Sequence, residues 1–364
     1  MERRRFLVKA GGALVAAGAA VAVDAPNVIA QPSFNWRLAH SFPPSADVLD
    51  GGAKRFARIV EEMTGGRLKI QVFAGGELIP AFGVFDAASQ GTLDTFMSAS
   101  YYWAGKEPAT QWFTAMPFGM NAQTQYAWYY HGGGLQLWEE TYAPFDLVPR
   151  PGISTGHQMG GWFKRKINGM ADLKGLKFRI PGLGGKAYAK AGVTVVLTPG
   201  GEIFPALERG VIDGTEWVGP HDDTKFGLHK AAKYYYFPGW HEPGTTGEFA
   251  FSKKAYDKLP KDFQRILDYA AQATALNGLA EYETKNAIAL EKLKAETKGK
   301  VEILQFPAEV VRGMRKLAAE VVKEEAEKTP IAKKVHASYT KFQALISDWA
   351  DISEAPYHQL ERKA

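Results

Sequence analysis

Two short segments near the start of the chain alternate between apolar and polar residues, and a helical pattern lies between them. The alternation predicts strands over residues 34–39 and 68–73, and a third short strand is expected over residues 92–98. Apolar residues near helical spacing predict helices over residues 45–63 and 81–89. This order is typical of parallel strands joined by crossover helices, so we expect an open α/β sheet.

A second unit with a similar order begins near residue 153, without sequence similarity to the first. Its expected strands cover residues 154–163, 176–180, 193–197, 213–218, 233–237 and 248–251. Its expected helices cover residues 184–191 and 204–209. Two α/β units agree with a chain of 364 residues at about 150 residues per domain.

A long helical pattern follows the second unit. Residues 260–298 contain helix-forming residues, and Gly278 is the only glycine among them. One helix of this span would be about 57 Å long at about 1.5 Å per residue. Two helices broken at Gly278 are the alternative, because an interior glycine costs only about 1 kcal/mol. A strand over residues 301–304 and helices over residues 307–328 and 331–349 are expected to follow.

The first 30 residues are expected to be a secretory signal peptide. Three arginines at residues 3–5 precede an uncharged run over residues 11–23, which is too short to span a bilayer. Short residues at 28–30 suit cleavage, so the mature chain would begin near Gln31. The paired arginines before Phe-Leu resemble a twin-arginine signal, and an ordinary Sec signal is the alternative.

Composition excludes several classes of protein. The sequence contains no cysteine, which rules out disulfides, cysteine-ligated zinc, iron–sulfur clusters and a cysteine nucleophile. The net charge of +5 is too weak and scattered to indicate a nucleic-acid partner. The mature chain is therefore expected to be an exported, soluble protein.

Candidate binding residues lie where predicted strands end. Arg179 ends the strand over residues 176–180, where its side chain could grip a carboxylate with two parallel N–H bonds. A solvated surface arginine is the alternative. Glu216 and Trp217 end another strand, where they could hold a cation and wall a pocket, or lie in an ordinary loop.

Glycine-rich and aromatic turns supply the remaining candidates. Gln158 lies among glycines and offers both a donor and an acceptor to a small polar ligand. Glu242 is a second carboxylate that would make an oxygen-rich cation site if it converged with Glu216. Tyr101 begins an aromatic run over residues 101–103 whose members cannot all point inward, and we assign it to the substrate pocket.

Other titratable residues give weaker signals. His157, His221, His229 and His241 lack the spacing of a zinc motif, and no histidine is expected to act with Glu216 or Glu242. Asp222 and Asp223 are expected to point apart and to start a helix. No nucleophile-elbow, Walker A or Rossmann glycine motif occurs.

Seven segments together resemble the solute-binding proteins of TRAP transporters, the DctP family. They cover residues 73–78, 130–134, 158–163, 173–179, 205–210, 216–220 and 235–240. The Leu-Lys-Gly-Leu-Lys-x-Arg segment is similar to a signature of the whole family. The Gly-Gly-Trp, Glu-Trp-Val-Gly-Pro and Tyr-Tyr-x-Pro-Gly-Trp segments resemble the subgroup that binds α-keto acids and related 2-oxo or 2-hydroxy monocarboxylates. The resemblance extends over nearly the whole mature chain.

The resemblance implies a two-lobed periplasmic binding protein fold of type II-like form, each lobe an open, mostly parallel sheet, with the long helix spanning both. Arg179 would pair with the ligand carboxylate and Gln158 would hydrogen-bond the ligand. Glu216, the Trp217 backbone carbonyl and Glu242 would hold a sodium or calcium ion bound with the carboxylate. The Glu242 loop reads His-Glu-Pro-Gly, a departure from the family pattern that leaves this position the least secure.

The implied organisation has four parts. They are a signal peptide at 1–30, lobe I at 31–153 plus about 246–275, lobe II at 154–245 plus about 286–328, and a C-terminal helical extension at 329–364. The implied function is capture of a monocarboxylate such as pyruvate or lactate for a TRAP permease in the membrane. An exported metal-dependent hydrolase or lyase is the alternative. The subgroup also implies a homodimer formed by exchange of the helix over residues 331–349.

Overall fold

The computed structural model describes residues 32–361. The expected signal peptide at 1–30 lies outside the described residues. No helix within the described range is both long and apolar enough to cross a membrane. Two sheets and two large clusters of buried apolar side chains organise this part of the chain.

The first sheet has five strands in the order β2–β1–β3–β10–β4. Their bounds are β1 Phe34–His40, β2 Leu68–Phe73, β3 Thr95–Ser98, β4 Leu147–Gly156 and β10 Thr245–Ser252. Strands β1, β2 and β3 are parallel, and the helices α1 Asp47–Met63 and α2 Val84–Ser89 connect them, as the alternation predicts. Strand β10 is antiparallel to both of its neighbours, β3 and β4.

The second sheet has six strands in the order β11–β9–β5–β8–β6–β7. Their bounds are β5 Gly161–Phe163, β6 Lys177–Arg179, β7 Thr194–Val196, β8 Gly214–Thr215, β9 Tyr234–Phe237 and β11 Glu302–Gln305. The helices α5 Gly182–Lys190 and α6 Gly200–Glu208 join the parallel strands β6, β7 and β8. Strand β5 is antiparallel to both of its neighbours, so both sheets are mixed.

The chain passes between the two sheets close to residues 153 and 246, the expected boundaries between the lobes. The single strand expected over 154–163 is in fact two strands, β4 in the first sheet and β5 in the second. The turn over residues 157–160 makes the passage, and the loop over residues 238–244 returns the chain from β9 to β10. Because each passage brings in a strand of reversed direction, each sheet contains antiparallel pairs.

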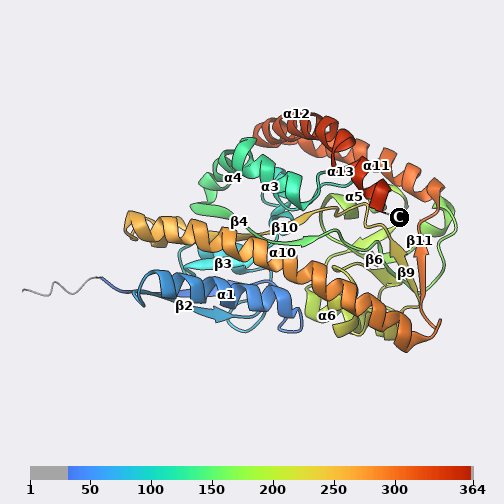
Figure 1. Ribbon diagram of the computed structural model, residues 1–364, viewed down its shortest axis with the longest axis horizontal. Helices are drawn as coiled ribbons and strands as arrows, with labels where there is room; N and C mark the ends of the chain where they lie inside the picture. Colours follow the sequence, from blue (N-terminus) through green and yellow to red (C-terminus); the bar gives the residue numbers. More distant parts are fainter. Residues whose placement is uncertain (1–31, 362–364) are drawn as a thin grey trace, which may run out of the picture. The chain divides into compact units, whose positions relative to one another are not determined.

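The long helix α10 Lys261–Thr297 is continuous over 37 residues, so the two-helix alternative is wrong. In Figure 1 it runs past strands of both sheets. Gly278 is needed where this helix packs on β4, because a Cβ there would lie 2.6 Å from Ile153 Cγ2. Close packing, rather than a helix break, therefore explains the glycine.

The remaining helices surround these sheets. Those after the second sheet are α11 Ala308–Ala326, α12 Pro330–Ile352 and α13 Glu354–Glu361. The shorter ones are η1 Ser100–Trp103, η2 Pro108–Phe113, η3 Ala143–Phe145, η4 Met170–Leu173, α7 Pro220–Lys225, α8 Leu228–Ala231 and α9 Lys253–Tyr256. The sequence pattern did not predict α3 Ala122–His131 and α4 Gly134–Tyr142. Their buried Trp128, Tyr129 and Trp138 pack into the first core cluster beneath α12.

Candidate functional site

A cavity with an empty volume of about 390 Å³ lies where segments of both sheets meet. Four of the predicted site residues line it: Tyr101, Gln158, Arg179 and Trp217. The other lining residues are Phe42, Leu49, Ala99, Tyr102, Ile153, Thr155, Val218, Thr245 and Gly247. A largely apolar cavity with a few convergent polar groups is typical of a site for a small ligand.

Arg179 at the end of β6 is 1% exposed, so the surface-arginine alternative is wrong. Its Nη1 donates to Glu216 Oε1 at 2.6 Å, and its Nε donates to the Thr198 carbonyl oxygen at 3.2 Å. Its Nη2 is buried and has no hydrogen-bond partner in the described part of the chain. An unpaired N–H group on a buried guanidinium is costly, and a ligand carboxylate could satisfy it.

Trp217 forms one wall of the cavity, and a hydrogen bond holds its indole ring in place. Its ring lies 5.3 Å from the guanidinium carbon of Arg179, within the range of a cation–π contact. Its Nε1 donates to Asp222 Oδ2 at 3.1 Å, and the Tyr282 hydroxyl of α10 donates to the same oxygen at 2.9 Å. The long helix thus helps to fix the orientation of the indole.

Gln158 projects from the turn between β4 and β5. Its Nε2 donates to Thr155 Oγ1 at 3.0 Å and to Thr245 Oγ1 at 3.1 Å. Its Oε1 is buried without a hydrogen-bond partner among residues 32–361. The amide is therefore anchored on one side and has an unused acceptor for a ligand or a cation.

The aromatic run at η1 divides its side chains between two environments. Tyr101 and Tyr102 line the cavity, whereas Trp103 is buried with its Nε1 donating to Glu248 Oε1 at 2.6 Å. This agrees with the expectation that the three rings cannot point the same way. A 3₁₀ helix separates the rings, rather than a strand end.

Glu216 and Glu242 converge behind the cavity wall, as the cation hypothesis requires. Glu216 contacts Arg179, and Glu242 Oε2 accepts a 2.6 Å hydrogen bond from Thr245 Oγ1. His241 joins them, with its Nε2 3.6 Å from Glu216 Oε2. All three are buried, and each has one ligand atom within 4.8 Å of the others.

Burial perturbs the pKa values of all three side chains in this cluster. Burial raises the pKa of Glu242 to about 8. Burial also raises the pKa of Glu216 to about 7, although Arg179 opposes the shift. Burial lowers the pKa of His241 to about 4, so its imidazole is neutral and supplies no compensation. Two buried carboxyls and a neutral imidazole thus fit a cation, which would favour the ionised carboxylates.

The place of His241 corrects the expectation that no histidine acts with either glutamate. The pairing of His241 with Glu242 in one turn was the signal available, but the ring's approach to Glu216 depends on the fold. His221 lies in a second cluster with Asp47 and Asp222. His157 is exposed and belongs to neither cluster.

Asp222 and Asp223 lie in the first turn of α7, which begins at Pro220 with Gly219 as its N-cap, so neither starts the helix as expected, and their carboxylates have different partners. Asp222 accepts from Trp217 and Tyr282, whereas Asp223 Oδ2 accepts from Trp162 Nε1 at 2.9 Å and from the Tyr235 hydroxyl at 2.7 Å. Both carboxylates support the pocket from behind.

A small, mostly apolar cavity between two mixed α/β sheets is the arrangement expected of a two-lobed solute-binding protein. The model of the family described as bacterial extracellular solute-binding protein, family 7 (DctP), matches residues 38–329. The chain belongs to this family. Because the family consists of binding proteins for transporters, the chain is a binding protein, and nothing supports the hydrolase or lyase alternative.

Three relatives are informative. A monocarboxylate 2-oxoacid-binding periplasmic protein of Nostoc sp. is 44% identical over 326 residues, which cover 90% of this chain and 88% of the relative. A TRAP solute-binding protein of Pseudoalteromonas atlantica, whose structure contains bound sodium and pyruvate, is 40% identical to this chain. The match covers 90% of this chain and 99% of that protein, with a TM-score of 0.87. A TRAP solute-binding protein of Bordetella bronchiseptica, a dimer with copurified calcium and picolinate, is 36% identical to this chain. The match covers 91% of this chain and 98% of that protein, with a TM-score of 0.89.

Proposed function

We propose that this protein captures a small 2-oxo or 2-hydroxy monocarboxylate, such as pyruvate or lactate, and delivers it to a TRAP permease in the membrane. The observation that carries the proposal is the buried Nη2 of Arg179, an unpaired cationic donor in a cavity small enough for such an acid. The Nostoc and Pseudoalteromonas relatives, which are named for 2-oxoacid and pyruvate binding, support the same class of ligand.

Each cavity residue has a distinct role in this proposal. Arg179 pairs with the carboxylate through N–H donors at the edge of its guanidinium, those of Nη2 among them. The free Oε1 of Gln158 can accept a hydrogen bond from the hydroxyl group of a 2-hydroxy acid. After rotation of the amide, its NH₂ group can donate to the carbonyl oxygen of a 2-oxo acid. Trp217 and Tyr101 enclose the carbon chain and exclude water, which strengthens the ion pair.

A sodium or calcium ion accompanies the carboxylate. Glu216, the Trp217 backbone carbonyl and Glu242 hold it, with His241 beside the two carboxylates. The ion supplies the positive charge that two buried carboxylates need in order to ionise together. Oxygen donors from carboxylates and carbonyls suit both ions.

The protein works outside the cytoplasm. We propose export through the signal peptide at residues 1–30 and action in the periplasm. The family description and the periplasmic Nostoc relative support this location.

The proposed binding motion closes two lobes. Lobe I consists of residues 31–153 plus about 246–275, and lobe II of residues 154–245 plus about 286–328. Residues near 153 and 246 act as hinges, because β4 and β10 lie at the two passages between the sheets. Helix α10 then serves as a strut along both lobes.

The C-terminal extension at 329–364 is proposed to form a homodimer. Its first half packs on its own chain, where the Tyr339 hydroxyl accepts a 2.9 Å hydrogen bond from the Met120 backbone N–H. Its second half exposes an apolar row formed by Leu345, Trp349, Ile352, Tyr357 and Leu360. Exposed apolar side chains that lie together mark interfaces, and the Bordetella relative is a dimer. The exchange is therefore assigned to the end of the helix rather than to all of residues 331–349.

A truncation ending at Gln343 tests the dimer, because it removes the exposed apolar row and keeps Tyr339. Light scattering at micromolar concentration should show a dimer for the mature chain and a monomer for the truncated one. A single-chain mass for the intact protein would disprove the dimer, and a truncated dimer would disprove the exchange.

Mass spectrometry of the acid released from purified protein tests the ligand class, followed by calorimetry with that acid in sodium and in calcium buffers. We expect one acid per chain and an affinity that depends on the cation. Conversion of pyruvate or lactate into another compound would favour the enzyme instead.

A further inference from the structure

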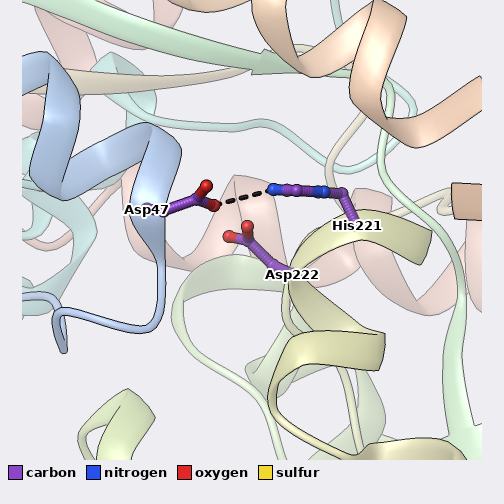
Figure 2. Close-up of side chains that lie close together, drawn as sticks. All are labelled: Asp47, His221 and Asp222. Atoms are coloured by element: carbon purple, nitrogen blue, oxygen red, sulfur yellow. Dashed lines mark hydrogen bonds and ion pairs between the residues drawn. The ribbon is translucent and has the colours of Figure 1, made fainter. Parts of the chain in front are cut away.

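A second cluster of metal-binding side chains lies apart from the carboxylate site. Asp47 is the first residue of α1, and His221 and Asp222 lie in the first turn of α7. Figure 2 shows the three side chains turned toward one another, with the Asp222 carboxylate beneath the contact between the other two. His221 Nε2 lies 2.7 Å from Asp47 Oδ1, and one ligand atom of each residue lies within 4.8 Å of the others.

The state of Asp222 points to a ligand at this cluster. Its side chain is fully buried, and Trp217 Nε1 and the Tyr282 hydroxyl both donate to its Oδ2. Its Oδ1 is buried with no hydrogen-bond partner among the described residues. A buried carboxylate oxygen without a donor costs free energy, which a coordinated cation would recover.

We propose that Asp47, His221 and Asp222 bind a divalent transition-metal ion and that Zn²⁺ fits the donor set best. One imidazole nitrogen and two carboxylate oxygens are ordinary zinc ligands, and water would complete a tetrahedron. Calcium takes six to eight oxygen ligands and is a poorer fit here, because this cluster lacks the ligand carboxylate that would add oxygens at the site of Glu216 and Glu242.

Two lysines moderate the affinity of the site. Lys225 Nζ lies 2.7 Å and Lys285 Nζ 3.2 Å from Asp47 Oδ2, so they occupy the oxygen that faces away from His221. Asp47 Oδ1 contacts His221 Nε2, and the ion would bind in place of that hydrogen bond. The ammonium groups repel a dication, so removal of one should strengthen binding.

The site would join elements of the two sheets. Helix α1 packs on β1 and β2 of the first sheet, whereas α7 follows β8 of the second. Asp222 also holds Trp217, the wall of the carboxylate cavity. If the proposed function is correct, zinc and the carboxylate should favour the same closed arrangement, and each should raise the affinity of the other by the same factor.

The first experiment measures zinc binding alone, on mature protein stripped with EDTA and without any carboxylate. Calorimetry and metal analysis after desalting should show a zinc site that His221→Gln and Asp47→Asn each weaken at least tenfold. Lys225→Gln should strengthen it, an effect that a damaged fold would not produce. His229→Gln is the matched control, since His229 faces the same groove beside α10 but lies outside the cluster.

Zinc affinity unchanged in both His221→Gln and Asp47→Asn would overturn the proposal, as would absence of zinc binding to the wild type at 100 µM or so. Loss of zinc only in Glu242→Gln would assign the ion to the other cluster and would equally overturn it. Titration with pyruvate, with and without zinc, then tests the coupling. A protein that binds zinc as described but not pyruvate would contradict the proposed function and leave the metal site intact.

Discussion

Replacement of Arg179 by lysine should weaken carboxylate binding while preserving the charge. In the structure Nε binds Thr198, Nη1 binds Glu216 and Nη2 is free. A lysine carries one nitrogen, which cannot hold Glu216 and also present a planar pair of donors to the ligand. At least one charge-assisted hydrogen bond is lost, worth about 1.5–3 kcal/mol. That loss corresponds to roughly 10-fold to 150-fold weaker binding, at about 1.4 kcal/mol per tenfold.

Calorimetry with the acid identified from the purified protein measures this loss directly, at fixed sodium and calcium concentrations. Arg150→Lys is the matched control. Arg150 is also a largely buried arginine in an ion pair, 2.5 Å from Asp268 and 2.7 Å from Glu139, but it does not line the cavity. We expect the control to bind within about twofold of the wild type. Wild-type affinity in a folded Arg179→Lys protein, judged by its thermal unfolding, would refute the assigned role.

Three further predictions concern stability and motion. Burial raises the pKa of Glu248 from 4.5 to about 7, so the folded state holds its proton where the unfolded state has lost it. The contribution of Glu248 to the free energy of unfolding should fall by roughly 3 kcal/mol as pH rises from about 4.5 to 7. Urea unfolding of the wild type and of Glu248→Gln measures this, because the difference between their free energies of unfolding should fall over the same pH range. A difference that does not change with pH would contradict the prediction. Gly278→Ala should lower the unfolding temperature, because overpacking against Ile153 costs about 1–3 kcal/mol, whereas the gain in helix propensity is about 1 kcal/mol. A higher unfolding temperature in the variant would mean that β4 can shift to make room for the added methyl group. Small-angle scattering should give a smaller radius of gyration with ligand bound, and identical curves at saturation argue against hinge closure.

The sequence predicted the regular elements well because their signals are local. Residues 68–73 alternate and form β2 with the same bounds, and residues 260–298 form one helix with Gly278 inside. Helix α3 was missed because its aromatic side chains, such as Trp128, leave no clear apolar stripe. Helix α4 was missed although its buried residues recur at helical spacing, at Gly134, Leu137, Trp138, Thr141 and Tyr142. Their position depends on α12, which lies about 200 residues further along the chain.

The site was predicted in part, and the missing parts are those fixed by contacts distant in sequence. Gln158, Arg179 and Trp217 could be proposed from their places beside strands and turns, together with the family resemblance. His241 could not be assigned, because its approach to Glu216 needs the loop over residues 238–244 to fold back across the end of β8. Asp47 and His221 are still further apart in sequence, and no motif spacing relates them.

The three connections between the sheets each contribute to the cavity, which ties binding to the relative position of the sheets. The turn after β4 carries Gln158, and the loop before β10 carries Glu242. Helix α10 contributes Tyr282, which reaches the cavity wall through Asp222 and Trp217. A change in the angle between the sheets would therefore move all three sets of groups at once. Ligand binding needs them together, so the free energy of binding can select one arrangement of the lobes without any further device.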